Sequence, residues 1–366
     1  TNIRSSTIIC TERLFVCFLK GARTMSELKE VFAAYKKLSF TDRIVFYTTL
    51  SNTVNVHEDN IQDFLIETRI CDGNTCIFCE GSHVVKNGKR KDGIQRFLCR
   101  DCKRSFIPSS CSVTSGTRKN LSVWAQYLKC MSDKKTLKET AEECSISVTT
   151  AFYWRHKILD ALQEVTDRVC LDGTVEADET FFNVSYKGNH KNSRQFIMPR
   201  KAHKRGNNIH RKGLSSEKVC VPCAVDVEGI AFAKPVKLGK VSTECLIDVF
   251  SGIVSPSAVL CTDNEKAYRL LARNKDIRLI QTNTDKRITK QNGITYGIQR
   301  INAYHSSLKS FIDRFHGVST KHLEHYIIWN NLIANNKRSK TENISLMFVQ
   351  IMRIRLTVHN SDISAR

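Results

Sequence analysis

Two pairs of cysteines are the feature that most limits how this chain can fold. Each pair has the form C-x-x-C, and residues 80–98 lie between the first pair, Cys76 and Cys79, and the second, Cys99 and Cys102. A C-x-x-C turn lets two thiolates meet on one metal ion, and a hairpin between two such turns assembles a tetrahedral four-thiolate site. The spacing therefore predicts a structural Zn²⁺ in a zinc ribbon over residues 71–111, a module too small to fold without its metal.

The other cysteines do not extend this pattern. The chain has 366 residues and 15 cysteines, and secreted disulfide scaffolds are usually much shorter, so a reducing cytosol with mostly free thiols fits better. We interpret Cys71 and Cys111 as bystanders beside the ribbon. Cys220 and Cys223 fall in a strand-like run in which residues three apart point to opposite faces, so we expect buried thiols there and no metal.

The charge of the chain indicates its class of partner. A formal net charge of +21 and a pI near 9.5 mark an excess of Lys and Arg that a polyanion would match, and nucleic acid is the first candidate. No uninterrupted apolar run approaches the roughly 18 residues that a membrane helix needs, so we expect no membrane partner.

The region before the α/β pattern is helical on both sides of the ribbon. Residues 25–70 have apolar positions at near-helical spacing, and we expect residues 1–24, upstream of Met25, to be a non-native extension without a structural role.

Residues 120–165 return to helical periodicity, and TLKETAEECSISVTTAFYWRHKILDAL at 136–162 resembles a helix-turn-helix. Leu137 and Ala141 are expected to face inward, with CSIS as the turn and Ser147 as the cap of the second helix. The second helix would bury Ala151, Trp154 and Ile158. Its outward side would then carry the groove-reading residues Thr149, Thr150, Tyr153, His156 and Lys157. A plain helical hairpin is the alternative.

From residue 172 to 335 short β-type runs alternate with helices, which predicts an α/β domain with a mixed sheet. Asp178 and Asp263 each stand at the end of a strand-like run. Acids there are costly unless they are paired or hold a metal, and two on neighbouring strands suit Mg²⁺. By strand alternation Glu176 shares the face of Asp178 as a spare acid, while Glu179 points away. Caps of helices or pairs with arginine are the structural alternative for these acids.

Two further segments carry chemistry. Residues 187–218 form a long basic stretch without periodicity, which we interpret as a loop that tracks a DNA backbone, with Lys204 and Arg205 as contacts. Residues 301–326 have the pattern of one long amphipathic helix. It brings Asn302 and Lys309, two helical turns apart, to one side, with His305 between them.

The order of these features resembles a known family. The ribbon, the helix-turn-helix, VEADETFF, CTDNEKAY and the run NAYHSSLKSFIDRFHGVSTKHLEHYIIW together resemble bacterial insertion-sequence transposases of the ISXO-type group. The resemblance covers roughly residues 70–335, and HSSLKSFIDRFHGVSTKHLEHYIIW is its most specific part. It implies a catalytic domain of the RNase H-like, retroviral-integrase-like fold.

The resemblance also implies a reaction. In that group two Asp residues and a Glu or Asn bind metal, with a Lys seven residues later, which carries over to Asp178, Asp263, Asn302 and Lys309. The implied activity is Mg²⁺- or Mn²⁺-dependent DNA cleavage and strand transfer with two ions, in the bacterial cytosol. Partners would be the double-stranded element ends and target DNA, and at least a dimer. His305 and Glu176 would be auxiliary residues.

Other functions remain open from the sequence. Because Asn302 is an amide where many related enzymes have Glu, a catalytically inactive, transposase-derived DNA-binding protein is one alternative, and a metal-dependent nuclease is another. An RNA-binding protein fits less well, since no aromatic-rich platform is visible. Residues 336–366 are predicted to be a tail without an assigned role.

Overall fold

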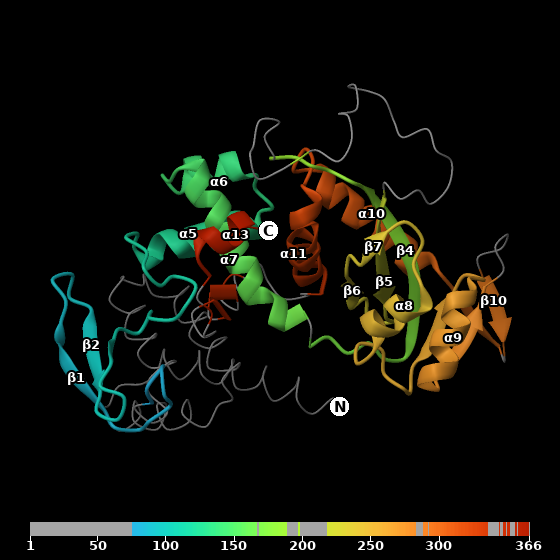
Figure 1. The fold of residues 1–366 in the computed structure, drawn as a ribbon. Helices are drawn as coiled ribbons and strands as arrows, with labels where there is room; N and C mark the ends of the chain where they lie inside the picture. The colour runs from blue at the N-terminus through green and yellow to red at the C-terminus, as the bar shows by residue number, and fades with distance from the viewer. Residues whose placement is uncertain are drawn as a thin grey trace, which may run out of the picture. The chain divides into compact units, whose positions relative to one another are not determined.

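The structure is a computed structural model that divides into two compact units (Figure 1). One unit comprises Thr1–Lys135 and Arg338–Thr357, and the other comprises Thr136–Lys337 and Val358–Arg366. The described residues are 75–166, 168–188, 197, 218–282, 288–291, 293–335, 344, 347–348, 350–351, 356 and 358–365. Predictions for residues 1–24 and 25–70, and for Cys71, Lys204 and Arg205, lie outside them.

The first unit contains a small antiparallel sheet. Its strands are β1 (Val84–Lys89), β2 (Gln95–Cys99) and β3 (Ser105–Phe106), in that order. The turn between β1 and β2 needs the left-handed backbone of Gly93, whose φ is 81°. The core under the sheet is short of apolar side chains and includes two of the cysteines themselves; it consists of Cys76, Ile77, Val84, Phe97, Cys99 and Phe106. Helix α5 (Leu121–Ser132) follows in the same unit.

The second unit begins with two helices joined by a tight turn, α6 (Leu137–Glu143) and α7 (Val148–Thr166). A capping box starts α6: the Thr136 side chain accepts from the Glu139 amide and the Glu139 carboxylate accepts from the Thr136 amide. Ser147 caps α7 as predicted, since its Oγ accepts from the Thr150 amide at 3.0 Å. The inward positions Ala141, Ala151, Trp154 and Ile158 are buried as expected, and Leu137 is half-buried.

A six-stranded mixed sheet forms the centre of this unit, as predicted (Figure 1). Its strands are β4 (Thr174–Asn183), β5 (Lys218–Val225), β6 (Ala231–Ala233), β7 (Lys237–Leu238), β8 (Val259–Thr262) and β9 (Arg278–Gln281). The order is β6-β5-β4-β8-β9, with β7 pairing β5. β5 runs antiparallel to β4 and β6, while β4, β8 and β9 are parallel. A further hairpin, β10 (Ile288–Gln291) and β11 (Ile294–Gly297), was not predicted.

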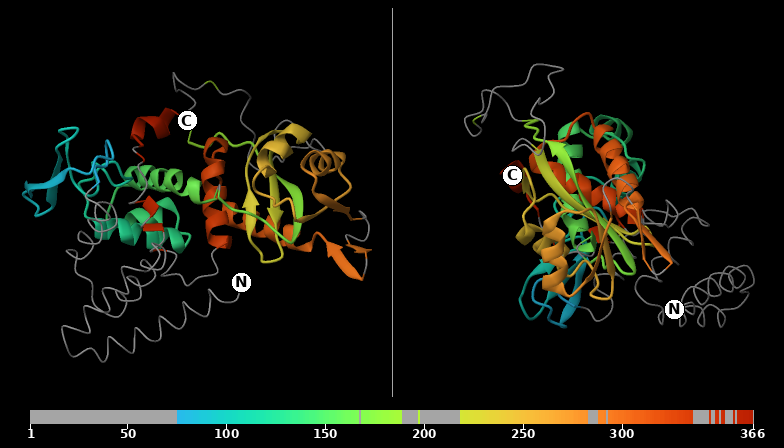
Figure 2. Two further views of the ribbon diagram at one scale, coloured as in Figure 1. Left: turned by 90° about the horizontal axis from the view of Figure 1, so that it is seen from below. Right: turned by 90° about the vertical axis from the view of Figure 1, so that its right-hand side faces the viewer.

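Alternation along β4 divides the sheet into two different faces. On one face Val175 and Ala177 join the main apolar core with helices α8 (Thr243–Phe250) and α9 (Lys266–Lys275). On the other face Glu176 and Asp178 meet helix α10 (Gln299–Asp313). Helix α11 (Leu323–Asn335) packs against β6 on this second side, and Figure 2 shows it apart from α8 and α9.

The helix predicted over 301–326 is interrupted. α10 ends at Asp313, and a 3-10 turn, η1 (Thr320–His322), precedes α11. His316 and Gly317 between them have φ values of 53° and 96°, in the left-handed region that no helix can include. The amphipathic pattern on both sides of this break is real, but its two parts belong to different helices.

Aromatic packing joins α7 to the two final helices. Trp329 is fully buried, and its ring centroid lies 5.2 Å from that of Phe311 and 5.1 Å from that of Phe315. The guanidinium of Arg155 on α7 lies 4.9 Å from the Trp329 ring centroid, a cation–π distance. Helices α6 and α7 therefore belong to the same compact unit as the sheet, and α5 belongs to the other unit.

The predicted tail also contains structure. Helix α13 (Asn360–Ala365) packs on α7, where the Ser364 and Tyr153 hydroxyls are 2.9 Å apart. Among the described residues no helix is both long and apolar enough to cross a membrane.

Replacing Trp329 tests whether this aromatic cluster holds the second unit together. We expect Trp329→Ala to lower the free energy of unfolding by about 3–5 kcal/mol, because it removes a fully buried indole and leaves a cavity. Leu270→Ala on α9 is the control, since Leu270 is 49% exposed and its loss is expected to change stability by less than about 0.5 kcal/mol. Urea unfolding of both variants measures the difference; equal effects would contradict the role of the cluster.

Candidate active site and zinc site

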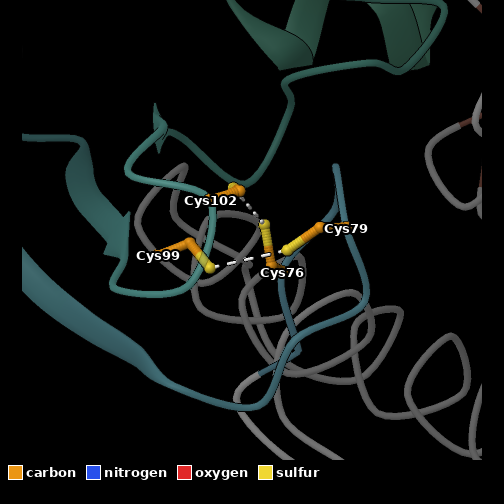
Figure 3. A group of neighbouring side chains, drawn as sticks. All are labelled: Cys76, Cys79, Cys99 and Cys102. Carbon is orange, nitrogen blue, oxygen red and sulfur yellow. Dashed lines mark hydrogen bonds between the residues drawn. The ribbon is translucent and has the colours of Figure 1, made fainter.

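The four predicted ligand cysteines converge in the first unit (Figure 3). The Sγ atoms of Cys76 and Cys102 are 3.7 Å apart, as are those of Cys79 and Cys99, and all four sulfurs lie within 4.8 Å of one another. Tetrahedral Zn–S bonds of about 2.3 Å place sulfur atoms about 3.8 Å apart. The donor set and its spacing therefore fit a structural Zn²⁺. A Cβ at Gly81 would meet the end of the Asp101 side chain, which would have to move to admit a larger residue.

Three further cysteines with predictions lie among the described residues, and Cys220 and Cys223 are buried as predicted. Cys111 is half-buried against the apolar side of the ribbon and is not among the four. Cys220 and Cys223 are fully buried on β5, and Cys220 belongs to the core beside α8 while Cys223 lies close to Asp178 on the opposite face. Burial raises the pKa of both thiols, to about 12 for Cys220, so neither is a thiolate at neutral pH.

The parallel pairing of β4 with β8 brings the two predicted aspartates together. Ala177 is the partner of Thr262 in the register, so Asp178 and Asp263 occupy the next position on each chain. Each carboxylate is held by the backbone that follows it. The Glu179 amide donates to Asp178 Oδ1 at 2.8 Å, and the Glu265 amide donates to Asp263 Oδ1 at 3.0 Å.

Burial makes two of the acids at this position costly to ionise. Burial raises the pKa of Asp178 from 3.8 to about 6; the Glu179 amide opposes the rise, the Asp263 charge adds to it and Lys309 lowers it. Burial likewise raises the pKa of Glu179 to about 7, with further contributions from Asp178, Asp263 and Glu265. Asp178 lies within β4 and not at its end as predicted, because the strand continues to Asn183. Two acids within β4 and two after β8 thus form a site whose negative charge a bound cation would stabilise.

Helix α10 supplies the groups that face these acids. His305 Nδ1 lies 4.0 Å from Asp178 Oδ2, and the exposed Lys309 one turn later interacts electrostatically with both. Burial first, and then the Lys309 charge, lowers the pKa of His305 to about 4, so its imidazole is neutral at pH 7. His305 can therefore accept a proton or bind a metal here, but it adds no charge.

Asn302 lies one turn before His305 on the same helix. Its side-chain nitrogen donates to the Ile298 carbonyl at 2.7 Å. This bond engages the nitrogen and makes Oδ1 the atom that can bind a cation. Asn302 is on the same helix as His305, whose Nδ1 atom lies 4.0 Å from Asp178 Oδ2.

Glu176 has a different role from the one predicted. It does share the face of Asp178, but its carboxylate is buried and both oxygens are used to position α10. Oε1 accepts from Arg300 Nε at 3.0 Å, and Oε2 accepts from the Ile301 amide at 3.1 Å. The start of α10 is therefore fixed to β4 two residues before Asp178, and Glu176 is a positioning residue.

The predicted DNA-contacting residues of α7 are in different environments. Thr149 is exposed and Thr150 is half-buried, with its hydroxyl 2.9 Å from that of Ser147. Tyr153 and Lys157 lie beside α13, where burial lowers the pKa of Lys157 and Asp362 opposes that shift. His156 was predicted to point outward, which is wrong: it is buried against His322 and His325 of the final helices.

Two residues of this region, Arg300 and Glu179, were not predicted from the sequence to take part in the site. Arg300 contacts Glu176, 124 residues earlier, and no local pattern marks such a pair. Glu179 was correctly placed on the face away from Asp178, yet it shares the acidic environment. The acidic residues that neighbour Asp178 and follow Asp263 in the sequence could have indicated that Glu179 belongs to the acidic site.

A comparison with protein families finds a match for the part of the chain that contains the six-stranded sheet. Residues 170–328 match the family of ISXO2-like transposase domains. An uncharacterized protein in transposable element ISH50 of Halobacterium salinarum is 26% identical over 137 residues, which are 36% of this chain and 45% of that protein. The chain thus matches less than half the length of this relative.

Solved structures give a weaker likeness. A Mos1 transposase paired-end complex with left transposon end is 13% identical, covering 44% of this chain and 59% of that chain, with a TM-score of 0.21. A Mos1 mariner paired end complex with Mn is 12% identical, covering 56% and 73%, with a TM-score of 0.22. With TM-scores this low, the whole chains do not superpose.

Asp178→Asn tests the electrostatic cost of the site. A folded-state pKa of about 6 means that the folded protein holds this proton more tightly than the unfolded chain. Stability is then lost as pH rises from about 4 to about 6, and the full loss persists above pH 6. In buffer without divalent cations we expect Asp178→Asn to raise the free energy of unfolding at pH 8 by about 1–3 kcal/mol, and by less at pH 5.

The matched control is Asp276→Asn, an exposed acid of the same domain at a left-handed position that Asn also accepts. It should change stability by less than about 0.5 kcal/mol at either pH. Urea unfolding of both variants and the wild type at the two pH values measures these changes in the free energy of unfolding. A destabilising Asp178→Asn at pH 8 would mean that the carboxylate is well paired within the protein.

Proposed function

We propose that this chain, whose residues 170–328 form an ISXO2-like transposase domain, is a DNA transposase of an insertion sequence that cleaves element ends and joins them to target DNA. The observation that carries the proposal is the parallel pairing of β4 with β8, which brings Asp178 within β4 next to Asp263 at the end of β8. Lys309 on α10 faces them.

The topology of the sheet supports an RNase H-like, integrase-like catalytic domain. In chain order the central strands are β4, β5, β6, β8 and β9, and in space they follow the order third-second-first-fourth-fifth. Only the second of these strands runs opposite to the rest. On this sheet Asp178 lies within the first strand and Asp263 directly follows the fourth.

Asp178, Asp263 and the Oδ1 atom of Asn302 are the proposed ligands of two Mg²⁺ or Mn²⁺ ions. When bound, these ions would activate a water molecule or a 3′-hydroxyl and stabilise the leaving oxygen of an in-line phosphodiester displacement. Both aspartates suit this task because their oxygens are hard ligands, and burial leaves the charge of Asp178 poorly compensated in the protein.

The remaining groups of α10 orient the DNA. Lys309 is exposed and lies near Asp178, so its ammonium can contact a phosphate beside the scissile bond. His305 is neutral at pH 7 and can receive a hydrogen bond or bind a metal as an auxiliary group. Glu176 and Arg300 keep the helix in place, so a change there would misplace Asn302 and Lys309 together.

DNA binding is proposed for the basic parts of the chain. A net charge of +21 supports strong, salt-dependent attraction to DNA. The zinc ribbon and the α6–α7 pair would recognise the terminal repeats, with Thr149 and Thr150 at the start of α7 as base-edge contacts and Tyr153 and Lys157 behind them. Lys204 and Arg205 would track the backbone. Synapsis of two ends implies at least a dimer.

Strand transfer in vitro tests the proposal. The full chain would receive Mg²⁺ or Mn²⁺ and a duplex carrying one end of its own element. We expect joined products with the wild type and a loss of at least about 100-fold with Asp263→Asn, since losing even an outer-shell partner of a metal typically costs 10–100-fold. Asp276→Asn, with the same change of charge at an exposed site, should retain activity.

The same assay separates the alternatives. Cleavage without joining would indicate a nuclease, and salt-sensitive binding without either reaction would indicate a DNA-binding protein in which Asn302 marks an inactive site. Asn302→Asp is the informative variant. If Asn302 is a ligand, this variant should remain active and need less Mg²⁺, because a carboxylate binds Mg²⁺ more strongly than an amide.

A further inference from the structure

Three buried histidines meet where α7 packs against η1 and α11. His156 comes from α7, His322 from η1 and His325 from α11. One ring nitrogen of each lies within 4.8 Å of the others. All three belong to the second unit, and this cluster is distinct from the acids of the candidate active site.

A carboxylate sets the orientation of one ring. His325 Nε2 lies 3.0 Å from Asp160 Oδ1 on α7, and because the carboxylate accepts, Nε2 carries the hydrogen. The other nitrogen of a neutral His325, Nδ1, then presents its lone pair to the cluster. A carboxylate that holds the far nitrogen of an imidazole is the arrangement that commonly orients metal-binding histidines.

The two facing nitrogens of His156 and His325 indicate where a cation would fit. His156 Nδ1 lies 2.6 Å from His325 Nδ1, so a single proton is shared across two nitrogens that both point to one spot. Imidazole ligands of a tetrahedral Zn²⁺, with bonds of about 2.0–2.1 Å, are about 3.4 Å apart. The 2.6 Å pair would have to open by less than 1 Å, and the other nitrogens already lie within 4.8 Å of one another, so small side-chain rotations can form the site.

The surroundings favour a structural site. The Phe152 ring lies 4.6 Å from the His156 ring centroid and 5.4 Å from that of His322, so aromatic walls shield the cluster from water. Asp160 supplies a nearby negative charge. Imidazoles with an oriented second nitrogen suit Zn²⁺ and similar transition-metal ions much better than Mg²⁺.

We propose that His156, His322 and His325 bind one Zn²⁺, with Asp160 as the positioning residue of His325. The ion would replace the proton between His156 and His325 and connect α7 directly to η1 and α11. The helical module would thereby be fixed to the sheet domain at a second point beside the Arg155–Trp329 contact. This site does not depend on the proposed transposase activity.

The zinc content of the full chain tests the site. Wild-type protein should hold two zinc ions per chain, one at the four cysteines and one at the three histidines. His325→Ala should reduce the count to one, and His316→Ala, an exposed histidine in the same segment, should leave two. Asp263→Asn should also leave two, which separates this site from the proposed catalytic acids.

X-ray absorption at the zinc edge identifies the ligands without relying on a histidine variant that could misfold. In wild-type protein the first shell should be a mixture of sulfur and imidazole nitrogen. In Cys99→Ala, the zinc that remains should have nitrogen or oxygen neighbours at about 2.0–2.1 Å. One zinc per wild-type chain with a pure sulfur shell would overturn the proposal and leave a hydrogen-bonded histidine stack.

Discussion

The parallel pairing of β4 with β8 is the interaction on which the active-site proposal depends. It places Asp178 and Asp263 one position beyond paired residues, where their carboxylates repel each other and one is largely buried. Backbone amides from Glu179 and Glu265 hold each group, but the pKa of Asp178 is still raised to about 6. Retaining such a pair at a cost in stability supports the proposal that positive charge binds there.

The opposite wall of the site depends on a second long-range contact. Glu176 binds both Arg300 and the Ile301 amide, so the first turn of α10 is tied to β4 close to Asp178. Everything that α10 offers, from the Asn302 amide to the Lys309 ammonium, is then set by helical geometry from a fixed start. Farther along, the contact of Arg155 with Trp329 connects α7 with α11, and α6, α7 and the sheet form one unit.

Features with a local period could be predicted from the sequence. The C-x-x-C spacing located four sulfurs that do converge, and strand alternation placed Cys220 and Cys223 on opposite faces and Glu176 beside Asp178. One failure required knowledge of distant partners. His156 has the polarity of a surface residue, but it is buried because His322 and His325 cover it. The helix expected over 301–326 is broken by left-handed backbone at His316 and Gly317, and this glycine was a local signal for a helix end that the periodicity argument passed over.

The central claim is that Asp178 and Asp263 share divalent cations on this domain. Crystals of the full chain soaked in Mn²⁺ would test it most directly, because manganese can be located by its anomalous scattering. If these residues are the ligands, the crystals should show a manganese peak contacted by both aspartates, with Asn302 Oδ1 as a further ligand. Manganese absent from this pair at saturating concentration, or bound only by other acids, would contradict it.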